Sequence, residues 1–102
     1  MNRKGLSMRL FEEVELEIKK NIKKVLGILI LDWNGFLVFS DIKEKDARDT
    51  ISALIIDIIK EIGSLSKIFG GGKINSCALR LGDYSLYITP GSNLILSVII
   101  RR

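Results

Sequence analysis

The chain has 102 residues, of which 47% are hydrophobic and 27% charged, and its formal net charge is +4. This length is typical of one domain, so we predict that residues 1–102 form a single domain with a packed core. The apolar runs are too short to span a bilayer, and no signal peptide follows Met1. We therefore expect a cytoplasmic protein without direct membrane insertion. One cysteine and no histidine exclude an internal disulfide and a zinc site built from these ligands.

The first predicted element is a helix from Leu6 to about Asn21. Its apolar residues recur at spacings of four, with Phe11 beside them, which is typical of a one-faced amphipathic helix; they are Leu6, Leu10, Val14, Ile18 and Ile22. Glutamates come early in this helix and the lysine pairs at 19–20 and 23–24 come late, the order that the helix dipole favours. A basic patch that meets an acidic partner is the alternative. No aromatic residues alternate with these lysines, so we expect no nucleic-acid partner.

The next segment predicts a β-hairpin. Val25 to Leu31 is too short and too uniformly apolar for a surface helix, which favours a strand buried on both faces. Asp32-Trp33-Asn34-Gly35 forms a turn in which Gly35 can take positive φ, and Phe36 to Ser40 returns as the second strand. Trp33 is not needed for the turn itself; it either covers the end of the core or contacts a partner.

A long helix from Asp46 to Phe69 is the central prediction. We expect its broad apolar side to lie on the core; that side consists of Ile51, Leu54, Ile55, Ile58, Ile62, Leu65 and Phe69. Asp46 and Asp49 predict a capped start, and the glycines at 70–72 predict the end.

A second stripe on this helix has alternating spacings of four and three residues and contains small side chains. Such a seam lets a second helix backbone come close, and a domain of this size has one core, so we predict a helix-mediated dimer. Packing against the first helix of the same chain is the alternative. The seam consists of Ser52, Ile56, Ile59, Gly63 and Ser66.

Three further strands are predicted after the glycines. The first, Ile74 to Leu81, is the most polar of the three, which is typical of an edge strand or of a strand that pairs with another chain. Gly82-Asp83 is a hairpin turn that leads into the second, Tyr84 to Thr89. The third, Leu94 to Ile100, is again almost wholly apolar. The two most apolar strands should be central. We therefore predict an α/β (α+β) fold with a five-stranded antiparallel sheet, numbered along the chain and ordered 2-1-5-4-3, between the long helix on one face and the first helix on the other.

Enzyme chemistry is not indicated. Without histidine the commonest general base is absent, and Cys77 lies in an alternating strand without a basic neighbour, which favours a buried structural thiol. The segment Gly70-Gly71-Gly72-Lys73 follows a helix instead of preceding one, so it does not match a phosphate-binding loop. We predict no catalytic residue, no cofactor and no metal.

The chain resembles the Roadblock / dynein light chain family, which includes the bacterial MglB-type proteins and the roadblock subunits of the Ragulator complex. The resemblance rests on VLGILILDWNGFLVFS (Val25 to Ser40), on the long helix, and on LGDYSLYITPGSNLILSVI (Leu81 to Ile99). It implies homo- or heterodimers in which the long helices pack together and the third strands pair, and these dimers serve as platforms for small Ras-like GTPases or larger assemblies.

The resemblance therefore implies a non-catalytic dimeric scaffold or regulator of a small Ras-like GTPase. Should it stimulate GTP hydrolysis, we expect it to do so by reordering residues of the GTPase. It adds Ile74, Ser76 and Ala78 of the third strand to the seam as dimer interface, and we expect Ala53, Lys60, Lys67 and Trp33 to contact the partner. A profilin-like or PAS-like small-molecule sensor and a structural subunit of a motor or trafficking complex are the alternatives. Isoleucine and lysine usage suggests an archaeal or thermophilic source.

Overall fold

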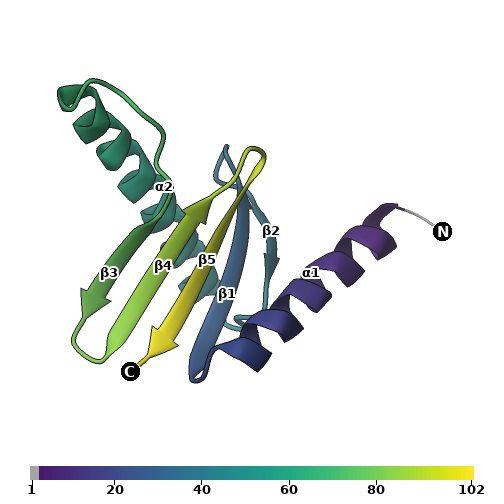
Figure 1. Cartoon of the computed structure of the whole chain (residues 1–102). Coiled ribbons are helices and arrows are strands. Elements are labelled where there is room, and N and C mark those ends of the chain that lie inside the picture. Colours follow the sequence, from purple (N-terminus) through teal and green to yellow (C-terminus); the bar gives the residue numbers. More distant parts are fainter. Residues whose placement is uncertain (1–2) are drawn as a thin grey trace.

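A computed structural model describes residues 3–102 of the chain. Its helices and strands follow the predicted order (Figure 1). Within the described residues, no helix is long and apolar enough to cross a membrane. The elements are α1 (Arg3–Asn21), β1 (Val25–Asp32), β2 (Leu37–Ser40), α2 (Lys45–Ile68), β3 (Cys77–Leu81), β4 (Tyr84–Pro90) and β5 (Leu94–Arg101).

The five strands form one antiparallel sheet in the order β2-β1-β5-β4-β3, as predicted. The two most apolar strands, β1 and β5, pair along nearly their whole length, and Leu31 lies opposite Ile95. Both of these side chains are fully buried. Uniformly apolar strands therefore occupy the centre of the sheet, because only central strands are covered on both faces.

The long helix α2 covers one face of the sheet and builds the main core. Ile55 and Ile59 from the helix pack with Leu31, Ile88 and Ile95 from three strands, and all five side chains are buried. Burying each such side chain is worth about 1.5 to 3 kcal/mol. This cluster therefore fixes the position of α2 on the sheet.

The first helix lies on the opposite face, also as predicted. Ile30 and Phe39 pair across β1 and β2, and because side chains alternate along a strand they face away from Leu31. The ring of Phe11 lies 5.8 Å from the ring of Phe39. Leu10, Val14 and Ile22 remain exposed although the helical spacing predicts them on the apolar face of the helix. Leu6 belongs to the part of α1 whose side chains are not described. The figure shows α1 diverging from the sheet toward its start (Figure 1).

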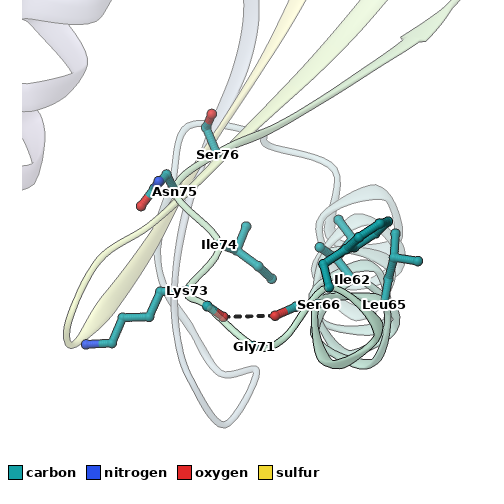
Figure 2. Close-up of a pocket in the computed structure, with 10 residues that line it drawn as sticks. Ile62, Leu65, Ser66, Gly71, Lys73, Ile74, Asn75 and Ser76 are labelled. Atoms are coloured by element: carbon teal, nitrogen blue, oxygen red, sulfur yellow. Dashed lines mark hydrogen bonds between the residues drawn. The ribbon is translucent and has the colours of Figure 1, made fainter.

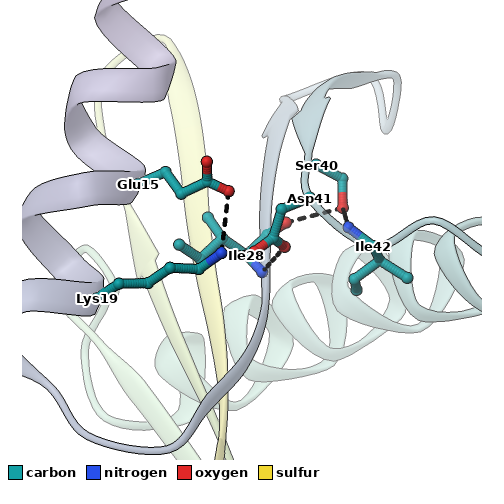
Figure 3. Close-up of polar contacts among 6 residues, drawn as sticks. All are labelled: Glu15, Lys19, Ile28, Ser40, Asp41 and Ile42. Atoms are coloured by element: carbon teal, nitrogen blue, oxygen red, sulfur yellow. Dashed lines mark hydrogen bonds and ion pairs between the residues drawn. The ribbon is translucent and has the colours of Figure 1, made fainter.

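A polar network holds the end of α1 against the sheet (Figure 3). Lys19 Nζ lies 2.7 Å from Asp41 Oδ2 and 3.2 Å from Glu15 Oε2, and Asp41 Oδ1 accepts a hydrogen bond of 2.7 Å from the backbone N–H of Ile28. The hydrogen bond to Asp41 raises the pKa of Lys19, and Glu15 adds to this effect. Asp41 thus joins α1, β1 and the segment after β2.

Several element ends differ from the prediction. The N-cap of α2 is Glu44, and it makes no side-chain cap hydrogen bond. The predicted cap by Asp46 is therefore wrong. At the other end of α2, the N–H of Gly71 donates a hydrogen bond to Ser66 O at 3.0 Å, which confirms that glycines help to end the helix. The third strand begins at Cys77 instead of Ile74, and β2 begins at Leu37, one residue later than predicted. Isolated apolar residues do not extend a strand when their backbone finds no ladder partner.

Candidate interaction surface

The side of α2 that faces the sheet carries residues of both predicted sides. Ile55, predicted in the core, is fully buried, and Ile51 and Ile58 pack against the same cluster. Ser52 and Ile59, which the sequence assigns to a partner, are only 6% and 8% exposed and lie inside the protomer beside Ile55. The physical reason is that a small side chain lets α2 lie close to its own sheet, as it would let it lie close to another helix.

Two other members of the predicted seam also contact their own chain. Ile56 packs over the β1–β2 turn, where its Cγ1 lies only 3.3 Å from the position that a Cβ would take at Gly35. Ser66 Oγ donates a 2.9 Å hydrogen bond to Gly72 O. Gly63 lines a cavity beside Trp33, and a Cβ there would meet no atom within 4 Å. The dimer itself stays a prediction.

One flank of α2 and the residue after its end carry exposed apolar side chains, although the sequence prediction places three of them in the core. Leu54 and Leu65 are 50% and 51% exposed, and Ile68 and Phe69 are 77% and 78% exposed. Large apolar side chains gathered on one exposed surface are typical of interaction sites. We call these residues, Leu54, Leu65, Ile68 and Phe69, the outer strip.

The outer strip borders an open groove of about 410 Å³ between α2 and the segment that leads into β3. Figure 2 shows Ile62 and Leu65 on the helix and Ile74 pointing toward them from the segment. Lys73 and Asn75 point to the other side of the segment (Figure 2). The groove therefore joins the apolar side of α2 to the approach to β3.

Beyond this groove lies the free edge of the sheet. Within residues 3–102, β3 pairs only with β4, so its outer edge has no ladder partner. Of the residues predicted to pair with a second copy, Ala78 lies in this strand and is exposed, whereas Ile74 and Ser76 lie in the preceding segment. Exposed edges of this kind accept a further strand.

Trp33 lies at the tip of the β1–β2 turn and meets the β4–β5 turn. Its Nε1–H donates a 3.0 Å hydrogen bond to Gly91 O, while 45% of the residue stays exposed. It lines a cavity of about 570 Å³ together with Ile59, Lys73 and Asn75. The indole of Trp33 thus links two turns and also has an exposed part. This position fits both predicted roles, covering the end of the core and contacting a partner.

The other predicted partner contacts lie on the solvent side of α2. Ala53, Lys60 and Lys67 are all exposed and recur every seven residues, which puts them on one line along the helix. Trp33 comes from a hairpin turn instead, so it does not continue this line.

The structure offers little for chemistry at these surfaces. Across the described part of the chain, no group of three or more His, Cys, Asp or Glu side chains lies close enough to hold a metal ion. Cys77 has a free thiol and is half-buried, and it packs against the core cluster under α2.

The residues of the outer strip are those that sequence reasoning placed on the wrong side. Ile68 was not assigned to either side, although it directly precedes Phe69 at the helix end. The width of the apolar arc, which continues from the buried isoleucines to Leu54 and Leu65, signals a second apolar surface but does not tell which part of the arc faces the sheet. An arc wider than one face cannot be buried by one sheet.

Comparison with solved structures identifies the fold. A Roadblock/LC7 domain from Streptomyces avermitilis matches 84% of this chain and 73% of its own with a TM-score of 0.76 and 20% identity. MglB from Myxococcus xanthus matches 76% of this chain and 65% of its own with a TM-score of 0.68 and 24% identity. A structure of MglB with a tetrameric arrangement matches 87% and 68% with a TM-score of 0.76 and 18% identity.

No protein-family model and no curated protein matches the sequence. The likeness lies in the architecture, two helices on an antiparallel sheet ordered β2-β1-β5-β4-β3. The chain has a Roadblock/MglB-like fold.

Proposed function

We propose that two copies of this chain pair through the outer strip and the free edge of β3, and that the dimer is a non-catalytic scaffold or regulator of a small Ras-like GTPase. The dimer proposal rests on the position of the outer strip near β3. Among residues 3–102, the outer edge of β3 has no ladder partner. These two features supply the two contacts that an extended sheet with paired helices needs.

The energetics favour covering this surface. Burying Leu65 or Ile68 in an interface is worth about 1.5 to 3 kcal/mol for each side chain, against a net domain stability of about 5 to 15 kcal/mol. In a symmetric dimer each contact is made twice. The similar MglB structure with a tetrameric arrangement supports association as a property of this fold.

The GTPase part of the proposal rests on the family resemblance. The line of Ala53, Lys60 and Lys67 stays on the solvent side of α2 and would be available in such a dimer. The dimer would act by reordering residues of the GTPase, because an arginine finger requires a guanidinium at the phosphates and no arginine is assigned to that position.

Light scattering of the purified chain tests the dimer. We expect twice the monomer mass for the wild type, and the monomer mass for Leu65→Asp, because a carboxylate in the middle of an apolar interface would be buried without a partner. Ser64→Asp is the matched control, since it adds the same charge one residue away on an exposed position. A dimer that survives Leu65→Asp would place the interface elsewhere.

Binding to small GTPases from the same genome tests the partner. We expect the dimer to bind one of them differently in the GDP form and in the form loaded with a GTP analogue. Ala53→Asp should weaken this binding and leave the dimer mass unchanged. Equal binding to both nucleotide forms would favour the structural-subunit alternative.

The cavity beside Trp33 favours a second candidate, a small-molecule sensor. Its volume of about 570 Å³ is in the range of ligand sites, and Lys73 and Asn75 supply polar groups. Trp33 is the single tryptophan, so its fluorescence reports occupancy. A saturable change with a metabolite library, lost in Lys73→Gln, would support the sensor; no change with any compound would argue against it.

A further inference from the structure

One rim of the sheet gathers cations from separate parts of the chain. Figure 1 shows the α1–β1 connection, the end of β5 and the β3–β4 turn at the same end of the sheet. The N–H of Arg101 donates to Lys24 O at 3.0 Å, and the N–H of Arg102 donates to Asp83 O at 2.6 Å. We call Lys23, Lys24, Arg101 and Arg102 the basic rim.

The charges of the basic rim are not neutralised within the protomer. Among the described residues, the ion pairs all involve Lys19, so none of the rim cations has a carboxylate partner. Asp83 is the single acidic residue in the turns that meet there. With a net charge of +4 for the whole chain, this rim carries most of the positive excess.

Lys24 holds its place at a conformational cost. Its φ is 61°, and it is the one non-glycine residue with positive φ in the described part of the chain. This region favours glycine, so a lysine there is strained. The α1–β1 connection therefore holds a cation at this rim in a conformation that glycine would adopt without strain.

Exposed apolar side chains flank the cations. Leu26 lies two residues after Lys24, and Leu81 and Tyr84 pair beside the β3–β4 turn. Leu81 is 73% exposed, and Leu26 and Tyr84 are also exposed. Cations mixed with exposed aliphatic and aromatic side chains are typical of surfaces that lie on a bilayer.

We propose that the basic rim docks on a membrane surface that contains anionic phospholipid. The four cations face the lipid phosphates, and Leu26, Leu81 and Tyr84 enter the headgroup region. The proposal needs no insertion of a helix and does not depend on the GTPase. A nucleic acid fits this rim less well, because Tyr84 is its only aromatic side chain and stacking on bases needs several; an acidic protein surface would leave Leu81 without a function.

Sedimentation of the full chain with vesicles tests the proposal. We expect binding to phosphatidylcholine vesicles that contain phosphatidylserine, no binding to phosphatidylcholine alone, and weaker binding as salt increases. Lys24→Gly should lower the affinity by about fivefold, since each cation near an anionic surface contributes about this factor. The same substitution relieves the positive φ, so it should raise the melting temperature.

Two more variants separate charge from packing. Lys23→Gln should lower vesicle binding by a similar factor, whereas Lys67→Gln, which removes an exposed cation from α2, should not. Leu81→Ser should weaken binding without changing its salt dependence. Binding that is equal on neutral vesicles, or unchanged in Lys24→Gly, would overturn the proposal, as would tight binding to RNA or polyglutamate with none to anionic vesicles.

Discussion

The two sides of α2 are both apolar in sequence, and they differ in what they contact. The inner side, with Ser52, Ile55 and Ile59, lies against the sheet and is buried. The outer side, with Leu54 and Leu65, is about half exposed although leucine is as large and as apolar as isoleucine. Size and hydrophobicity therefore did not decide which side faces the core.

The difference follows from shape. The inner side alternates small and branched residues, which lets the helix approach a twisted sheet closely and fill the spaces between strands. The outer side presents Leu54 and Leu65, which no strand of this sheet covers. Substitutions on the inner side of α2 should therefore change the stability of the fold, and substitutions on the outer side should change association.

Ile55→Ala should have the largest effect. The residue is fully buried in the core cluster, so its truncation should lower the free energy of unfolding by about 2 to 5 kcal/mol in urea denaturation. Leu54→Ala, at the next position on the outer side, should lower the free energy of unfolding much less when the protein concentration is low enough to keep the chain monomeric. Equal losses at both positions would show that the two sides are packed alike.

Ile68→Asp should act on association and not on the fold. The side chain is exposed in one protomer, so the far-UV circular dichroism should be unchanged, while dimer formation should weaken by about 2 to 4 kcal/mol, as for a central interface residue. The wild-type melting temperature should rise with protein concentration, and that of the variant should not. A concentration dependence retained by the variant would contradict the outer strip as interface.

Gly35→Ala should disturb the inner edge of α2. Gly35 has φ of +92°, and an added Cβ would come within 3.3 Å of Ile56 Cγ1. Both effects destabilise, together by about 1 to 3 kcal/mol. The substitution should cost less in an Ile56→Ala background, because alanine lacks the Cγ1 atom that the new Cβ would crowd. An equal cost in both backgrounds would mean that backbone strain alone is responsible.

Ser52→Ala should have the smallest effect. The Ser52 hydroxyl is buried, and among the described residues it has no hydrogen-bond partner. Removing an unsatisfied hydroxyl while keeping a small side chain should change the stability by less than about 1 kcal/mol, in either direction. A loss above 2 kcal/mol, measured by urea denaturation, would require a hydrogen bond and not only close packing.

Much of the fold could be predicted from local patterns. The apolar runs at Val25 and Leu94 predicted the two central strands, and the turns at Gly35 and Gly82 predicted hairpins, because these features depend on neighbours within a few residues. The start of α2 and of β3 could not be predicted as well, since Asp46 and Ile74 have side chains that fit either side of an element boundary.

The sequence by itself determined that α2 has more apolar surface than one sheet can cover, and with it the expectation of a partner. Only the tertiary structure decided which side the sheet takes, because that choice depends on how closely Ser52 and Gly35 let the backbone elements approach one another. It also decided the basic rim, where Lys24 meets Arg101 through a backbone hydrogen bond. Residues so distant in the chain become neighbours only when the strands pair, and no local pattern records that pairing.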